Sequence, residues 1–123
     1  MRSAQVVSIV DDDEAARLAT GSLVRSFGWQ THVFASAEEF LLSSDLASTS
    51  CLISDIMMPG MSGVEMHDRI IALGYARPTI FITAFPSAQL KAKALANGAL
   101  AVLDKPVDPD AIAHWLSIAL DAP

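Results

Sequence analysis

The sequence of 123 residues is poor in cysteine, in positive charge and in long apolar runs. Its single cysteine, Cys51, cannot form an internal disulfide, which excludes a disulfide-held fold and leaves a buried apolar role for the thiol. Eight Lys and Arg stand against fourteen Asp and Glu, and this net charge of −6 argues against direct nucleic-acid binding by the chain. No run approaches the ~20 apolar residues of a membrane span. The first residues lack a signal-peptide pattern, so we expect a cytoplasmic protein without a membrane partner.

A glycine-rich phosphate loop is also missing from the place where a nucleotide-binding α/β protein would have one. Residues 6–10 are almost continuously apolar, as in a strand that is covered on both faces, and three aspartates follow at once. Glycines at that position would indicate binding of a nucleotide phosphate, so the aspartates argue against a dinucleotide-binding fold. The acidic residues are therefore the first candidates for function.

Strand and helix signals alternate five times along the chain. Apolar segments predict strands over residues 6–10, 30–34, 51–55, 79–83 and 101–103. Capping signals at Ser36, Ser62, Ser87 and Asp108 predict the starts of four helices, and Asp13 is the preferred cap of the remaining helix. This order predicts one α/β domain, a doubly wound five-stranded parallel sheet with helices on both faces. The more polar segment 30–34 fits an edge strand.

Periodicity and composition also predict which side chains fill the core. Apolar residues at helical spacing predict the buried stripe of the first helix, namely Ala16, Ala19, Leu23 and Phe27. The two tryptophans, Trp29 and Trp115, are expected to be packing residues. The three histidines have no metal-ligand spacing and are expected at the surface or its boundary, namely His32, His67 and His114.

Polar residues lie at the ends of four predicted strands, and the carboxyl ends of parallel strands meet at one edge of the sheet. These residues are Asp11, Asp12, Asp55, Thr83 and Lys105. Three carboxylates at adjacent strand ends repel one another, and a hard divalent cation removes that penalty. Mg²⁺ takes oxygen ligands and few of them from protein, so the acids predict a magnesium site. Capping and a favourable helix-dipole interaction are the alternative explanation for the aspartate run.

Asp55 is also a possible nucleophile, because carboxylates form acyl phosphates in some enzymes. Phosphoryl transfer depends mainly on positioning and charge neutralisation. Lys105 offers a mobile cation and Thr83 a hydroxyl that can reach a new phosphoryl oxygen. Singly, these two residues would be an ordinary surface lysine and a strand-end polar residue, so it is the combination that indicates phosphoryl chemistry.

The chain resembles a response-regulator receiver domain over essentially its whole length, and its motif sequences are most similar to those of FixJ-type receivers. The matching segments are Ile9-Val10-Asp11-Asp12, Ser54-Asp55 with the following run to Gly63, Ile82-Thr83-Ala84 and Asp104-Lys105-Pro106. The resemblance implies a flavodoxin-like (βα)5 fold with strand order 2-1-3-4-5. It implies a single receiver domain over residues 1–123, with no effector domain in this chain.

The resemblance also implies roles for the residues that match. Asp55 would be the phosphoacceptor, charged by a sensor histidine kinase or a phosphotransfer protein in a Mg²⁺-dependent reaction. The implied Mg²⁺ ligands are Asp12, Asp55 and the Met57 backbone carbonyl, with Asp11 acting through water. Lys105 and Thr83 would contact the phosphoryl group together with the Ala84 backbone amide, and a cis peptide bond would precede Pro106. Such a domain is not an enzyme beyond its own phosphorylation and dephosphorylation.

Two departures from the family pattern affect the expected switch. Val102 stands where the family has a switch aromatic, so switching would depend more on the loop at Phe85 and Pro86. Met57 and Phe85 stand where polar groups help to place a hydrolytic water, which predicts a long-lived phosphoryl group. The resemblance further suggests a homodimer through the fourth helix, fifth strand and fifth helix, or an effector domain if the receiver was excised from a longer regulator.

Two other functions stay open at the level of sequence. A receiver-like adaptor that binds partners without phosphorylation is favoured only by Val102. A small Mg²⁺-dependent phosphatase of the haloacid-dehalogenase type is suggested by the Asp-x-Asp within residues 11–13. That enzyme would normally have Thr or Val after its motif, where this chain has Glu14 and Ala15, and it would leave Asp55 unexplained.

Overall fold

Strands and helices alternate five times over residues 5–85 and 87–120, which are the residues that the computed structural model describes. The strands are β1 (Val6–Val10), β2 (Gln30–Phe34), β3 (Cys51–Asp55), β4 (Thr79–Thr83) and β5 (Ala101–Asp104). The helices are α1 (Glu14–Ser26), α2 (Ala37–Leu41), α3 (Gly63–Ala72), α4 (Ala88–Ala96) and α5 (Pro109–Ala119). Pro86, part of the loop expected to move, lies outside the described residues.

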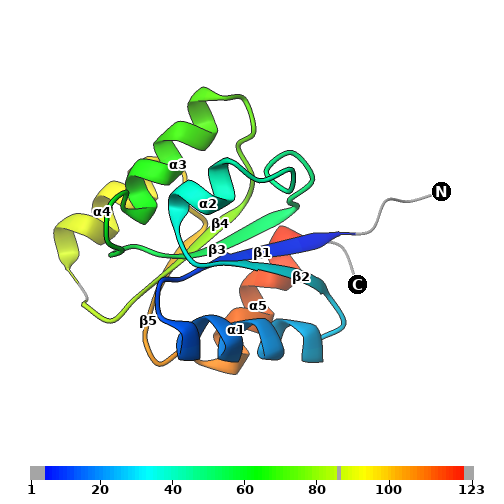
Figure 1. Cartoon of the computed structure of the whole chain (residues 1–123). Coiled ribbons are helices and arrows are strands. Elements are labelled where there is room, and N and C mark those ends of the chain that lie inside the picture. The colour runs from blue at the N-terminus through cyan, green and yellow to red at the C-terminus, as the bar shows by residue number, and fades with distance from the viewer. Residues whose placement is uncertain (1–4, 86, 121–123) are drawn as a thin grey trace.

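The strands form one parallel sheet in the order β2-β1-β3-β4-β5 (Figure 1). This order and the doubly wound fold confirm the prediction. β2 is an edge strand, as its polar composition indicated. In the register Val10 pairs with Ser54, Asp55 with Ile82 and Thr83 with Asp104. The carboxyl ends of β1, β3, β4 and β5 therefore lie level. Residues that follow these strands are thereby brought to one edge of the sheet.

Two apolar layers hold the helices to the sheet. α1 and α5 cover one face, and α2, α3 and α4 cover the other (Figure 1). Alternate strand residues point to opposite sides, so that Ile9 and Ile53 meet α5 at Ile112, whereas Val10 belongs to the layer that includes α2 and α3. Each fully buried aliphatic side chain contributes roughly 1.5–3 kcal/mol, so these layers carry most of the stability.

The helix starts are those that the capping signals predict. The side chains of Ser36, Ser62, Ser87 and Asp108 each accept a hydrogen bond from a backbone amide in the first turn of their helix. At Ser62 the reciprocal bond from Glu65 is also present, which completes a capping box. Asp13 caps α1 by accepting from the Ala16 amide, at 3.2 Å.

The predicted buried stripe of α1 is partly wrong. The buried residues of this helix are Thr20, Gly21 and Val24, whereas Ala19 is exposed and Leu23 and Phe27 are only partly buried. Gly21 explains the shift, because a Cβ atom there would lie 3.3 Å from the Val33 side chain on β2. The small residue lets α1 approach the sheet closely, and the helix turns that side inward.

The histidines divide into two groups. His32 and His114 are exposed, as expected, but His67 on α3 is 3% exposed, so its expected surface position is wrong. The His67 ring packs edge-on against Phe81 of β4, with 5.6 Å between ring centroids. The residue occupies a core position of the helix, which its polar type concealed. Trp29 is buried and Trp115 packs against the same core, as predicted.

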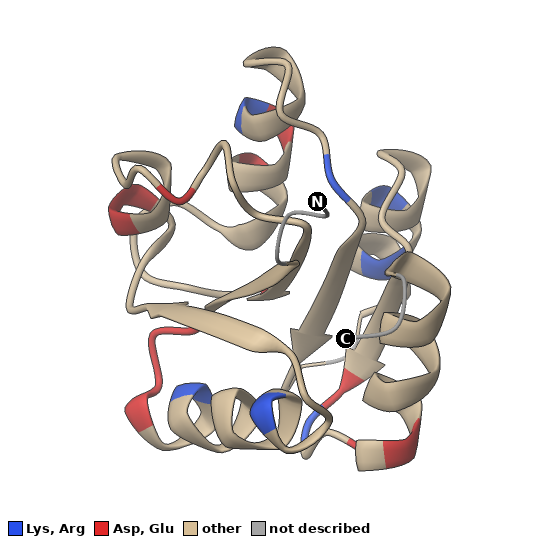
Figure 2. Ribbon diagram, turned by 90° about the vertical axis from the view of Figure 1, so that its right-hand side faces the viewer, with Lys and Arg blue, Asp and Glu red and all other residues tan. Residues whose placement is uncertain are grey.

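The basic side chains are spread over several elements of the molecule. Lys and Arg lie on several separate helices and loops rather than along one element (Figure 2). Among residues 5–85 and 87–120, we find no helix with the length and apolar character that crossing a membrane requires.

Candidate functional site

Three carboxylates meet at the carboxyl ends of β1 and β3. Asp11, Asp12 and Asp55 each place an oxygen within 4.8 Å of the other two. Asp11 and Asp55 are buried, at 0% and 6% exposure, while Asp12 is exposed. β1 and β3 are neighbours in the sheet, and this pairing brings together acids that lie more than forty positions apart in the sequence.

Lys105 supplies the positive charge at this cluster. Its Nζ atom lies 2.8 Å from Asp55 Oδ2 and 3.0 Å from Asp11 Oδ2. Burial by itself would lower the pKa of Lys105, but the hydrogen bonds and charges of Asp55 and Asp11 outweigh burial and raise it. The lysine is therefore firmly protonated and neutralises one of the three carboxylates.

Asp55 lies between competing influences. Burial raises the pKa of Asp55, the contact with Lys105 lowers it, and the nearby charge of Asp11 raises it again, so the net effect is a raised pKa. Its Oδ1 accepts a hydrogen bond from the Met57 amide at 3.1 Å. Both oxygens are thus held in place, one by a backbone amide and one by Lys105.

Asp11 fits a hard cation for a reason of its own. Its Oδ1 accepts a hydrogen bond from the Asp13 amide at 2.9 Å. Its Oδ2 is completely buried and, within the described residues, accepts no well-directed hydrogen bond despite the nearby lysine. The ion pair with Lys105 leaves a lone pair of this buried oxygen that a divalent cation, or its bound water, would satisfy. The donor set is all oxygen and carries excess negative charge, so the residues fit Mg²⁺.

The remaining predicted site residues surround the acids. Thr83 ends β4 and is 3% exposed, and the Phe85 amide donates to its hydroxyl at 3.0 Å. Ala84 follows it and is exposed. Met57 lies in the loop after β3 and is 49% exposed. The peptide bond between Lys105 and Pro106 is cis, as the resemblance implied.

Two residues that shape the site were missed by sequence reasoning. The guanidinium of Arg17 donates to the Asp11 backbone carbonyl at 2.9 Å and so fixes the acidic turn. Gly63 begins α3, where a Cβ atom would lie 2.3 Å from the Asp55 backbone oxygen. The only signals available were a basic residue one turn after the acids and a glycine directly after the Ser62 cap.

A doubly wound sheet with an acidic cluster and a lysine at its carboxyl edge is the design of a flavodoxin-like signalling domain. Comparison with family models makes this specific: residues 7–117 match the response regulator receiver domain. The chain therefore belongs to the response regulator receiver domain family, whose members act as receivers in two-component signalling.

Individual relatives agree with this assignment. The response regulator protein TodT of Pseudomonas putida F1 is 36% identical over 117 residues, which are 95% of this chain and 52% of TodT. The transcriptional regulatory protein FixJ of Bradyrhizobium diazoefficiens is 30% identical over 114 residues, which are 93% of this chain and 56% of FixJ. The chain thus spans about half the length of these curated relatives. Among solved structures, the chemotaxis protein CheY4 of Vibrio cholerae superposes with a TM-score of 0.86 at 26% identity, over 96% of this chain and all of that one.

Proposed function

We propose that this receiver accepts a phosphoryl group on Asp55 from the phosphohistidine of a sensor histidine kinase or phosphotransfer protein, in a Mg²⁺-dependent reaction. The observation that carries the proposal is the arrangement around Asp55. A buried carboxylate at a strand end is bonded to Lys105 on one side and lies within 4.8 Å of two further acids on the other. Lys105, together with a Mg²⁺ ion held by the acids, would neutralise a phosphoryl group without any proton transfer, and charge neutralisation is what phosphoryl transfer requires.

The residues divide the work of the transfer. A carboxylate oxygen of Asp55 forms a bond to phosphorus as the phosphorus–nitrogen bond of the donor breaks, and the imidazole leaves with that electron pair. Lys105, already 2.8 Å from Asp55, stays with the developing negative charge on the phosphoryl oxygens. Asp12, Asp55 and the Met57 carbonyl would hold Mg²⁺, with Asp11 acting through water, and the bound ion would neutralise a further phosphoryl oxygen.

Thr83 and the Ala84 amide would detect the product. The Thr83 hydroxyl accepts from the Phe85 amide, and the same hydroxyl can turn to donate to a phosphoryl oxygen. Such a turn changes the loop between β4 and α4, so a new charge on Asp55 would alter the surface of α4 and β5.

The output of this change would be partner binding or dimerisation. α4, β5 and α5 present Lys91 and Lys93 together with Asp104 and Asp110 on exposed positions, so two copies could pair opposite charges across this face. The relatives include transcriptional regulators of which this chain covers 56% and 58%, which supports an effector domain as the other candidate for this contact. A rise in molar mass by light scattering after loading with beryllofluoride, an acyl phosphate mimic, would support the dimer.

The test of the phosphoacceptor is intact mass after incubation with acetyl phosphate and Mg²⁺. Wild type should gain one phosphoryl group, and Asp55→Asn should gain none. Asp13→Asn is the matched control, because asparagine caps a helix as well as aspartate does and Asp13 makes no contribution to the three-acid cluster. A wild type that binds Mg²⁺ but gains no mass would refute the proposal and favour the phosphorylation-independent adaptor. The phosphatase alternative gains no support from the family assignment, and turnover of a free phosphate ester would be needed to revive it.

A further inference from the structure

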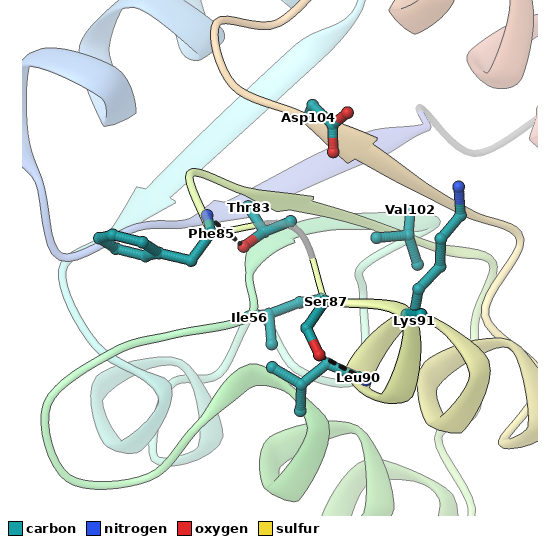
Figure 3. A pocket seen from close by; sticks show the side chains of 9 residues that line it. Ile56, Thr83, Phe85, Ser87, Leu90, Lys91, Val102 and Asp104 are labelled. Carbon is teal, nitrogen blue, oxygen red and sulfur yellow. Dashed lines mark hydrogen bonds between the residues drawn. The ribbon is translucent and has the colours of Figure 1, made fainter.

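A cavity of about 180 Å³ lies between the end of β4, the start of α4 and β5. Its lining includes Ile56, Thr83, Leu90 and Val102, with Lys91 and Asp104 at its rim (Figure 3). The family pattern would place an aromatic ring at position 102, and the half-buried valine there is too small to occupy this space. The space is a pocket at the surface rather than an enclosed void, so a side chain can enter or leave it without unfolding of the core.

The cavity is the right size for a phenyl ring. An apolar cavity of ~150 Å³ in another protein binds benzene, and this one is slightly larger. Ile56, Leu90 and Val102 give it an aliphatic side that suits a ring, and Thr83, Ser87, Lys91 and Asp104 give it a polar side. Phe85, from the loop that follows Thr83, also lines it, so a side chain of that loop can enter.

Phe85 is an exposed ring beside this cavity. Its residue also lines the cavity, yet 71% of it is exposed and the ring points away from Val102 (Figure 3). The Phe85 amide is bonded to the Thr83 hydroxyl at 3.0 Å, and this bond fixes the backbone with the ring outward. A large exposed ring beside an unfilled cavity is placed so that an inward rotation would bury it.

We propose that the cavity beside Val102 is the receptor for the Phe85 ring of the same chain, which enters it when Asp55 is phosphorylated. The inference rests on the proposed function and adds the moving group to it. Phe85 would thereby supply the moving aromatic ring that Val102 cannot provide.

Thr83 couples the ring to the phosphoryl group. In the resting state its side chain lines the cavity and holds the Phe85 amide. When the hydroxyl turns toward the phosphoryl group, it vacates one wall and releases that amide, so the outward conformation loses a contact and the inward one gains room. The phosphoryl group therefore interacts differently with the two conformations, which is the condition for shifting their populations.

The consequence appears on the α4–β5 face. Lys91 of α4 and Asp104 of β5 stand at the rim of the cavity (Figure 3). With the Phe85 ring inside the cavity, a partner would contact a filled apolar surface between two opposite charges. In the resting state the same surface is hollow.

The test uses the full chain with labelled methyl groups and protonated phenylalanine rings, with Mg²⁺ and beryllofluoride. Loading is read from the fluorine signal of bound beryllofluoride, and entry from nuclear Overhauser effects between the Phe85 ring and the methyls of Val102 and Leu90. These effects should appear on loading, with an upfield shift of the Val102 methyls.

Three variants separate the ring from other causes. Phe85→Leu should load but lose the shift, and Val102→Phe should load while Phe85 stays outside, because the cavity is filled in advance. Leu73→Ala removes an exposed apolar residue, 56% exposed and remote from the cavity lining, and should behave as wild type.

The outcomes distinguish this inference from the proposed function. Loaded wild type without contacts between Phe85 and Val102 overturns the ring movement and leaves the phosphoacceptor standing. Contacts found only between differently labelled copies assign the ring to a second molecule and also overturn it. Failure to load, seen in the fluorine signal, overturns both.

Discussion

Removing the charge of Asp12 should stabilise this protein in the absence of metal. The three acids of the site lie within 4.8 Å of one another, and Lys105 pairs with only the two buried ones. Asp12 therefore adds repulsion that the single charge of Lys105 offsets only in part. Asp12→Asn keeps the shape of the side chain and removes that charge, so it isolates the electrostatic cost of the site.

The magnitude follows from the distances. Two unit charges 4.8 Å apart repel by ~0.9 kcal/mol at the dielectric constant of water, and Asp12 has two such neighbours. Because Asp12 is exposed, the aqueous value applies, and physiological salt with a Debye length of ~8 Å reduces the sum of the two to about 1 kcal/mol, which is an upper limit because Lys105 attracts Asp12. A change of this size raises Tm by roughly 4 °C in a domain of this length.

Urea unfolding measures the effect, first in chelator and then in excess Mg²⁺. In chelator Asp12→Asn should be the more stable protein. A ligand at a hundredfold its Kd adds ~2.7 kcal/mol to the free energy of unfolding, and only wild type keeps the full ligand set, so Mg²⁺ should reverse the ranking. Asp13→Asn, which retains the cap, should stay within ~0.5 kcal/mol of wild type in both. A variant less stable than wild type in chelator, or one that gains as much from Mg²⁺, would falsify the reasoning.

Three further changes test other parts of the structure. Burial lowers the pKa of His67 in the folded protein below 6.5. As pH falls through 6.5 the unfolded state therefore takes up a proton first, and the free energy of unfolding should decline until pH passes the folded pKa. Urea unfolding from pH 7.5 to 5 measures this decline. Gly63→Ala should lower the free energy of unfolding, because overpacking against Asp55 costs ~1–3 kcal/mol and outweighs the ~1 kcal/mol that alanine gains in a helix. Urea unfolding measures this loss. Met57 and Phe85 leave the acceptor without a polar group to place water, so the phosphoryl group should be long-lived and Met57→Asn should shorten its life severalfold, by timed intact mass.

Each of these expectations has a result that contradicts it. His67→Phe should flatten the pH dependence while exposed His114→Gln leaves it intact, and the opposite pattern would assign the titration elsewhere. Gly63→Ala with wild-type stability would mean that α3 can move away from β3. A wild-type phosphoryl lifetime as short as that of chemotaxis receivers would refute the role given to Met57 and Phe85.

The sequence was a good guide to the fold because the signals there are local. Apolar segments of about five residues, caps such as Ser62 and stops such as Gly74 are set by neighbours within a few positions. The misses came from packing over longer range. His67 is polar yet buried against Phe81, and α1 turns Gly21 to the sheet, because the side that a helix buries depends on what approaches it.

The functional site likewise has features that local sequence predicts and features that depend on long-range packing. The sequence by itself determined which residue types follow the strands, and the strand–helix order required their strand ends to meet at one edge. It did not contain the 2.8 Å contact of Lys105 with Asp55, the burial of the Asp11 carboxylate or the close approach of Gly63. It indicated that Val102 stands where the family has an aromatic residue. Only the tertiary structure revealed the cavity of about 180 Å³ and the exposed Phe85 beside it. Volumes and contacts between distant segments arise only when the layers close, and for that reason the tertiary structure alone decided them.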